Sequence, residues 1–175
     1  RKVGFAPLAE QLLTKQDDPN IIAEPFAKRA QYSVEEALEQ ARYILADEIS
    51  HDPQFRPRVR QLVFERGVIS ASSALEDPKE DLVYSTYHDF RQPVRQIPPH
   101  RVLALDRGER QGKLTVRIEP PLEAITQFLA GRLIRKGAPA SGWLLETIDY
   151  SLKNLLLPAV YREIRGMLTE KAEEQ

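Results

Sequence analysis

The sequence predicts a mainly α-helical protein: a multi-helical domain with a small two-stranded β-ribbon and a long C-terminal helix. Three observations lead to this prediction. Apolar residues recur at helical spacing through most of the 175 residues, a capping box marks one helix start, and the final third holds apolar stripes of helical period. Only two short segments, about 68–74 and 114–118, have the composition or alternation of strands.

The N-terminal segment is expected to begin with one helix. Between Phe5 and Leu13 the apolar residues lie three and four positions apart, and Pro7 falls in the first turn, where no helical hydrogen bond is lost. Pro19 and Pro25 follow. Because a proline inside a helix removes a hydrogen bond and clashes with the preceding turn, this stretch is expected to form only short helical turns.

The next segment is predicted to be a helical hairpin. Ser33 and Glu36 form a capping box, and a long amphipathic helix follows them. Asp52 as the N-cap and Pro53 at the first helical position predict the start of a second helix, which ends at Gly67. The two helices are joined by a very short connection, which is typical of a hairpin.

The middle of the chain is predicted to hold the two strands and several short elements between them. The segments at about 68–74 and 114–118 are expected to form a ribbon packed on helices. Between them we expect a short helix at about 81–87, a connector at 92–99 broken by prolines, and a helix at about 99–107.

The final third is predicted to be helical throughout. Apolar stripes run through 122–133 and 144–155, and Pro158 is expected to kink or restart the second helix. Residues 168–175 are strong helix formers without a glycine or proline stop, so the last helix is expected to continue beyond them. The predicted division is a helical domain at 1–140, followed at 141–175 by helices that lead into a long central connecting helix.

Composition excludes several classes of function. The chain has no cysteine, which rules out disulfides and thiolate metal sites, and no apolar run nears the roughly 20 residues that span a bilayer. The formal net charge is −1, whereas a domain that mainly grips phosphates usually has a strong excess of Lys and Arg. Contact with nucleic acid would therefore come from a local patch or from other parts of a larger protein.

No catalytic or cofactor motif is complete. His51 follows Glu48 at the spacing of half a di-metal site, but the second half is missing and a histidine also suits a helix C-terminus. Residues 108–113 resemble a phosphate loop that is one residue short and lacks the required Ser or Thr. The chain is therefore expected not to be an enzyme, and to use no metal, cofactor or small-molecule substrate.

One stretch of the chain is strongly basic. Between residues 91 and 117, seven basic residues stand against two acidic ones, Asp106 and Glu109. One interpretation is a surface for nucleic acid or a protein partner, with a helix N-terminus that can meet an anion. Its candidate residues are Arg91, Arg95, His100, Arg101, Lys113 and Arg117. The favoured alternative is that the basic stretch pairs with the acidic residues at 76–89, or with further domains.

Several strings along the chain resemble the N-terminal region of the Tex family of bacterial transcription accessory proteins, in the family's order. They are GFAPLA at 4–9, ALEQARYILA at 37–46, YHDF at 87–90 with IPPHRVLA at 97–104, and LLLPAVYREIR at 155–165. The resemblance implies a multi-domain protein related to eukaryotic elongation factors. Its helical region with helix-turn-helix character leads through a long central helix to an RNase H-like domain, helix-hairpin-helix elements and an S1 domain. Those domains are expected to lie outside this chain.

The resemblance also implies a cytoplasmic factor in transcription that binds RNA or DNA through the full-length protein. For this segment we expect an architectural role, with helices that pack into the axis carrying the other domains. The alternative hypothesis is a protein-interaction module that contacts RNA polymerase through the basic surface between Arg91 and Arg117.

Overall fold

The computed structural model describes residues 4–174, which divide into two compact units. Unit 1 holds residues 4–56 and 123–158, and unit 2 holds residues 57–122 and 159–174. Each unit is therefore built from two stretches that are far apart in the sequence. The domain boundary that the sequence analysis places at residue 140 stays a prediction.

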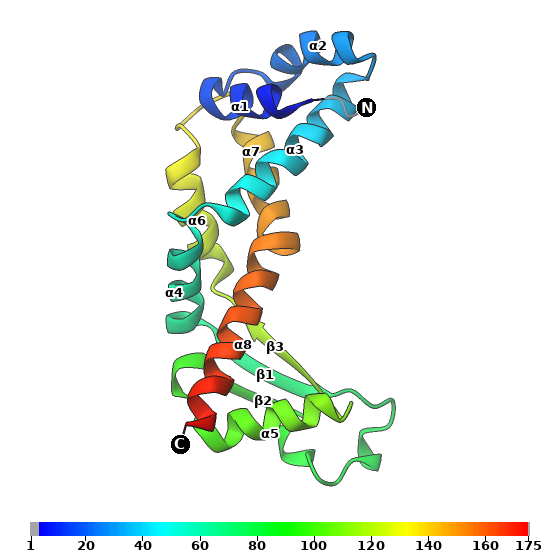
Figure 1. Ribbon diagram of the computed structural model, residues 1–175, viewed down its shortest axis with the longest axis vertical. Helices are drawn as coiled ribbons and strands as arrows, with labels where there is room; N and C mark the ends of the chain where they lie inside the picture. Colours follow the sequence, from blue (N-terminus) through cyan, green and yellow to red (C-terminus); the bar gives the residue numbers. More distant parts are fainter. Residues whose placement is uncertain (1–3, 175) are drawn as a thin grey trace. The chain divides into compact units, whose positions relative to one another are not determined.

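Unit 1 is helical. Its helices are α1 (Ala6–Lys15), α2 (Pro19–Ala30), α3 (Val34–His51), α6 (Leu122–Leu133) and α7 (Ser141–Ser151), followed by a π turn, η4 (Leu152–Leu156) (Figure 1). The predicted capping box of α3 is confirmed, because Ser33 Oγ accepts the Glu36 N–H at 3.0 Å and Glu36 Oε1 accepts the Ser33 N–H at 2.8 Å. The fully buried side chains of this unit include Leu8, Leu12, Leu45, Ile125, Leu129, Leu144, Ile148 and Leu152.

One buried glutamine joins the ends of α1 and α6. Gln16 follows α1 in the left-handed conformation, with φ of 56°. Its side-chain amide donates to the carbonyl oxygens of Leu13 at 2.9 Å and Leu133 at 2.6 Å, and its Oε1 accepts the Arg135 N–H at 2.8 Å. Its own carbonyl accepts the Ala140 N–H at 3.0 Å. Four hydrogen bonds thus satisfy polar groups at the point where two helices end.

Two predictions about helix boundaries are wrong. Helix α2 is one helix of 12 residues, with Pro25 inside it. Pro25 cannot donate to the carbonyl of Ile21, but both residues are exposed, so water can hydrogen-bond to that carbonyl instead. Helix α4 (Arg56–Arg66) begins later than predicted, after a turn at 53–55, although the Asp52 carboxylate accepts the Gln54 N–H at 2.8 Å as an N-cap does.

Unit 2 combines a three-stranded antiparallel sheet with helices. In chain order its further elements are β1 (Val68–Ser73), the 3-10 turns η1 (Pro78–Glu80) and η2 (Ser85–Tyr87), β2 (Phe90–Pro93), the 3-10 turn η3 (Val94–Gln96), α5 (Pro99–Arg110), β3 (Leu114–Glu119) and α8 (Leu157–Glu173) (Figure 1). Strand β1 lies between β2 and β3. The predicted pairing of β1 with β3 is confirmed, whereas β2 is an additional edge strand that overlaps the start of the predicted connector. The short helix predicted at about 81–87 is wrong: only the 3-10 turn η2 forms there, because Asp81 accepts the Val83 and Tyr84 N–H groups in a turn.

One face of the sheet is covered by α5 and α8. Ile69, Ala71 and Val116 point to this face and are buried. The Tyr161 hydroxyl on α8 donates to the Val116 carbonyl at 2.9 Å. Close packing on α5 is possible because Gly108 has no side chain there: an added Cβ would lie 2.5 Å from a methyl carbon of the Leu114 side chain.

The long C-terminal helix is confirmed, because helical residues follow one another from Ser141 to Glu173. Within this run, the Leu157 N–H donates to the Leu152 carbonyl five residues back, which makes the π turn. Pro158 follows immediately and cannot donate a hydrogen bond. The interruption expected at Pro158 therefore takes the form of a π turn directly before it.

Candidate nucleic-acid interface

The sheet face opposite the buried one carries two of the six candidate residues. Arg91 on β2 and Arg117 on β3 both lie directly opposite Ser70 on β1. Directly opposed residues have Cβ atoms about 4.5–5.5 Å apart, so the two arginines flank the serine on one face. Both arginines are exposed. The strand register thus brings together two cations that are far apart in the sequence.

A carboxylate on the same face neutralises one of these cations. Glu119 accepts two hydrogen bonds from the Arg91 guanidinium, one of them 3.3 Å long. The hydrogen bond from Arg91 lowers the pKa of Glu119, and the same bond raises the pKa of Arg91. Within residues 4–174, no ion pair is found for Arg117. The face therefore keeps one unpaired cation, Arg117.

The start of α5 carries two more candidates, His100 and Arg101, as predicted. His100 is exposed. The Arg101 guanidinium instead turns back to β2, where it donates to Gln92 Oε1 at 3.3 Å and lies 5.5 Å from the centre of the Phe90 ring. Gln92 and Phe90 belong to the covered face by strand alternation, so Arg101 does not join Arg91 and Arg117.

The remaining candidates lie elsewhere in unit 2. Arg95 is exposed in η3, and Lys113 directly precedes β3, where its carbonyl accepts the Ala74 N–H at 2.9 Å. The six candidates therefore divide among a sheet face, a helix start, a 3-10 turn and the turn between α5 and β3, instead of forming one continuous cluster. Their contact with nucleic acid or a protein stays a prediction.

The two carboxylates inside the basic stretch bind a residue that the sequence analysis missed. Arg165 on α8 donates to both Asp106 and Glu109 on α5, each at 2.8 Å, and Asp106 also accepts the Thr169 hydroxyl at 2.6 Å. Burial acts to lower the pKa of Arg165, but the hydrogen bonds to Glu109 and Asp106 outweigh it, so the pKa is raised above its ordinary value. These acids tie α5 to α8 and are satisfied there.

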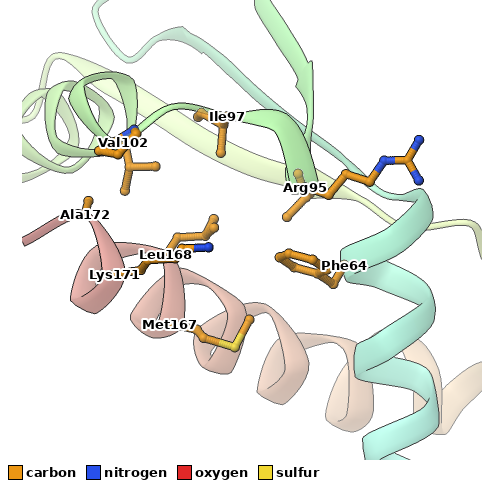
Figure 2. Close-up of a pocket in the computed structure, with 10 residues that line it drawn as sticks. Phe64, Arg95, Ile97, Val102, Met167, Leu168, Lys171 and Ala172 are labelled. Carbon is orange, nitrogen blue, oxygen red and sulfur yellow. The ribbon is translucent and has the colours of Figure 1, made fainter. Parts of the chain in front are cut away.

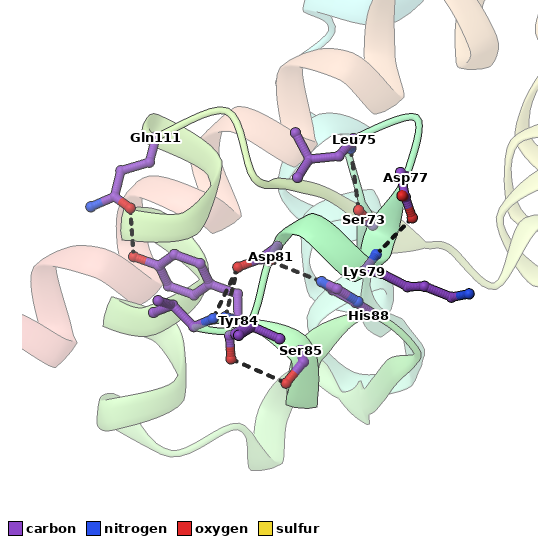
Figure 3. Close-up of polar contacts among 11 residues, drawn as sticks. Ser73, Leu75, Asp77, Lys79, Asp81, Tyr84, Ser85, His88 and Gln111 are labelled. Atoms are coloured by element: carbon purple, nitrogen blue, oxygen red, sulfur yellow. Dashed lines mark hydrogen bonds and ion pairs between the residues drawn. The ribbon is translucent and has the colours of Figure 1, made fainter.

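The acidic stretch at 76–89 does not neutralise the basic stretch either. Asp81 is buried, accepts the N–H groups of Val83 and Tyr84 at 3.1 Å each, and lies 2.9 Å from His88 Nε2 (Figure 3). The hydrogen bond from His88, aided by the two backbone N–H groups, lowers the pKa of Asp81. Across residues 4–174, no ion pair joins the acidic stretch to the basic one.

Over the described residues, 4–174, no group of three potential metal ligands gathers, and no helix is long and apolar enough to cross a membrane. His51, the candidate half-site, lies with its Nδ1 2.9 Å from the Asp47 carbonyl at the end of α3.

Unit 2 also contains an apolar groove of about 310 Å³ between α4, η3, the start of α5 and α8 (Figure 2). Its apolar lining includes Phe64, Ile97, Val102, Met167 and Leu168. Arg95 and Lys171 supply its charged side chains. Sequence analysis missed this groove, because its lining comes from four separate segments that only the tertiary fold brings together.

These features define a class before any comparison: a mainly helical protein of two units, with a polar sheet face and an apolar groove in one of them. The chain belongs to the Tex family. The family model described as "Tex central region-like" matches residues 14–175. The family resemblance seen in the sequence is thereby confirmed.

Three relatives show the extent of the similarity. The protein YdcI of Bacillus subtilis is 40% identical over 178 residues, covering 98% of this chain and 25% of that protein. Protein tex of Bordetella pertussis is 30% identical, covering 100% of this chain and 24% of that protein. The human S1 RNA-binding domain-containing protein 1 is 26% identical, covering 100% and 19%. The chain thus spans about a quarter of the length of its bacterial relatives.

Proposed function

We propose that this chain is an architectural segment of a transcription accessory protein, and that other domains of the full-length protein carry most of its RNA or DNA binding. The helical run from Ser141 to Glu173 is the observation that carries this proposal. It places Leu144 and Ile148 in the core of unit 1, and Ile164 and Leu168 in the core of unit 2. A helical run that contributes residues to the cores of both units suits a structural role. Local unfolding of either core would also destabilise this helical run.

Charge and family membership support the proposal. The net charge of −1 and the separation of the six candidate residues argue against a phosphate-gripping domain. The names of relatives, "Transcriptional accessory protein Tex" in Neisseria gonorrhoeae and "S1 RNA-binding domain-containing protein 1" in human, point to transcription and RNA binding in those proteins. We extend these roles to the full-length parent of this chain, and place it in the cytoplasm.

The first experiment measures binding by the 175-residue chain to single-stranded RNA and duplex DNA by fluorescence anisotropy at several salt concentrations. We expect weak binding with a shallow dependence on salt, since few phosphates would be contacted. Tight binding at physiological salt with a steep slope would refute the architectural role. The chain is also proposed not to be an enzyme, and nuclease or nucleotide hydrolysis by the pure chain would contradict that.

A second experiment tests the shared helix directly. Leu152→Asp changes a fully buried residue that belongs to unit 1, whereas Lys153→Asp changes its exposed neighbour. We expect faster amide hydrogen exchange in α8 of unit 2 for Leu152→Asp and no change for Lys153→Asp. Exchange that increases only in unit 1 would show that the helical run does not connect the stability of the two units.

The second candidate function is a contact with RNA polymerase through the basic surface. The observation in its favour is that Arg165 binds both Asp106 and Glu109, so these acids do not neutralise the exposed arginines around them. Charge reversal at Arg95 and Arg101 should then weaken capture of polymerase by the chain. Unchanged capture by both variants would exclude this function.

A further inference from the structure

A turn in unit 2 presents two large apolar side chains to solvent. Leu82 is 82% exposed and Val83 is 80% exposed, more than any other large apolar residue within 4–174. The turn is well held, because Asp81 accepts the Val83 and Tyr84 N–H groups and lies within hydrogen-bond distance of His88. Figure 3 shows Asp81 between Tyr84 and His88. An exposed apolar pair on a fixed turn is typical of a contact surface. We name Leu82 and Val83 the tip.

The charges around the tip indicate what kind of partner it fits. Four exposed acidic residues lie close to it in the sequence and outnumber the one exposed cation there, Lys79: they are Glu76, Asp77, Glu80 and Asp89. Such a surface repels phosphates, so nucleic acid is a poor partner. It fits a protein surface with an apolar centre and cations beside it.

The groove of unit 2 has this complementary character. Met167 is 43% exposed and lies in the groove beside Phe64 and Leu168 (Figure 2). Arg95 and Lys171 are both exposed, and Figure 2 shows the Arg95 guanidinium pointing away from the apolar side chains. An apolar tip could therefore enter the groove while nearby carboxylates meet these two cations.

The tip cannot reach the groove of its own chain. The Tyr84 hydroxyl, next to the tip, donates to Gln111 at the C-terminal end of α5 at 3.0 Å. Pro99 and Val102 line the groove at the N-terminal end of the same helix. At about 1.5 Å per residue, α5 separates the two places by roughly 15 Å. A contact between tip and groove must therefore join two molecules.

We propose that the tip of one copy of this chain docks into the groove of a second copy. Both halves of the contact occur on every copy, and they are different surfaces. The contact is therefore heterologous, and it adds molecules head to tail into short open chains instead of closing a symmetric dimer. This self-association goes beyond the architectural role and does not depend on it.

The experiment uses sedimentation velocity of the chain over a wide range of concentrations. The wild-type average mass should rise beyond that of a dimer. A tip variant, Leu82→Asp with Val83→Asp, and a groove variant, Met167→Glu, should each weaken association roughly tenfold to a hundredfold. A mixture of the two variants should form dimers and nothing larger, because one intact tip and one intact groove remain.

Two matched controls test specificity, and circular dichroism confirms that every variant is folded. Ile21→Asp removes another highly exposed apolar side chain, and Leu145→Glu changes a residue that is 43% exposed, the same fraction as Met167. Both controls should associate like the wild type. The proposal is overturned if the wild type stays monomeric, or if the tip and groove variants associate as strongly as the wild type. It is also overturned if the mixture of the two variants does not form dimers, or if the controls lose association.

Discussion

Replacing Arg165 with methionine tests the contact between α5 and α8 in unit 2. The guanidinium donates at 2.8 Å to Asp106 and to Glu109, and it also donates to the Tyr161 hydroxyl. The side chains of Arg165 and Asp106 are only 12% and 15% exposed. The small energies measured for surface ion pairs therefore do not apply to this pair.

The expected loss of stability follows from the Asp106 carboxylate, which loses its cation. Methionine removes the donors, so the buried carboxylate of Asp106 keeps only the Thr169 hydroxyl as a side-chain partner. Breaking a buried ion pair on one side costs roughly 3–5 kcal/mol. The remaining hydrogen bond places Arg165→Met near the lower limit, at about 3 kcal/mol. At about 2–4 °C per kcal/mol for a chain of this size, Tm should fall by roughly 6–12 °C.

Thermal and urea denaturation measure this loss, and two further variants control it. Arg165→Met combined with Asp106→Leu should recover most of the stability, because apolar side chains often replace a buried ion pair at little cost. Glu109→Gln should cost less than about 1 kcal/mol, since that carboxylate is 42% exposed. A loss below about 1 kcal/mol for Arg165→Met, or a double variant as unstable as the sum of its single changes, would refute the reasoning.

Of three further predictions, two can be checked in the same denaturation experiments and the third by hydrogen exchange. Gly108→Ala should destabilise by up to about 2 kcal/mol, because its Cβ would lie 2.5 Å from a buried leucine; Gly166→Ala, with open space around it, should stabilise by about 0.5–1 kcal/mol. Gln16→Ala should cost roughly 1–3 kcal/mol by leaving part-buried backbone groups unsatisfied, whereas Gln31→Ala, equally left-handed but exposed, should cost under about 0.5 kcal/mol. Equal effects within the glycine pair would contradict the packing argument, and equal effects within the glutamine pair would contradict the hydrogen-bond argument. The hydrogen bond from His88 lowers the folded-state pKa of Asp81, so its stabilisation is complete above about pH 4 and is lost as pH falls through the folded value. Hydrogen-exchange protection factors, which correct for the intrinsic pH dependence of amide exchange, should therefore fall at residues 81–88 on acidification in the wild type and stay constant there in Asp81→Asn.

Predictions succeeded where the signal is local. The capping box needs only Ser33 and Glu36, which lie three residues apart, and the sequence places its helix correctly. Strand β2 was missed because its four residues include Pro93 and only pairing with β1 makes them a strand. Pro25 was misjudged for a related reason: whether a helix tolerates a proline depends on solvent access to the freed carbonyl, which the sequence does not give.

The candidate site was predicted from the density of basic residues along the chain. That density does not show on which face of the fold each side chain lies. Strand register places Arg91 and Arg117 on one face, whereas Arg101 turns to the other. Arg165 lies outside the basic stretch, so no count within that stretch could include it. The tip at Leu82 and Val83 was assigned to a short helix at about 81–87, and the sequence did not show that the Asp81 turn would leave both side chains exposed.

The ion pairs that Arg165 makes with Asp106 and Glu109 determine which charges the surface of unit 2 leaves unpaired. Arg165 neutralises Asp106 and Glu109, so these two acids do not reduce the positive charge of the exposed arginines near them. Arg165→Met should therefore weaken any contact with an acidic partner as well as the fold itself. Arg165→Met with Asp106→Leu and Glu109→Gln separates these effects, because it removes the buried cation and both acids but keeps the surface arginines. If the triple variant binds the partner as well as the wild type does, the surface arginines make the contact, and Arg165 contributes to stability alone.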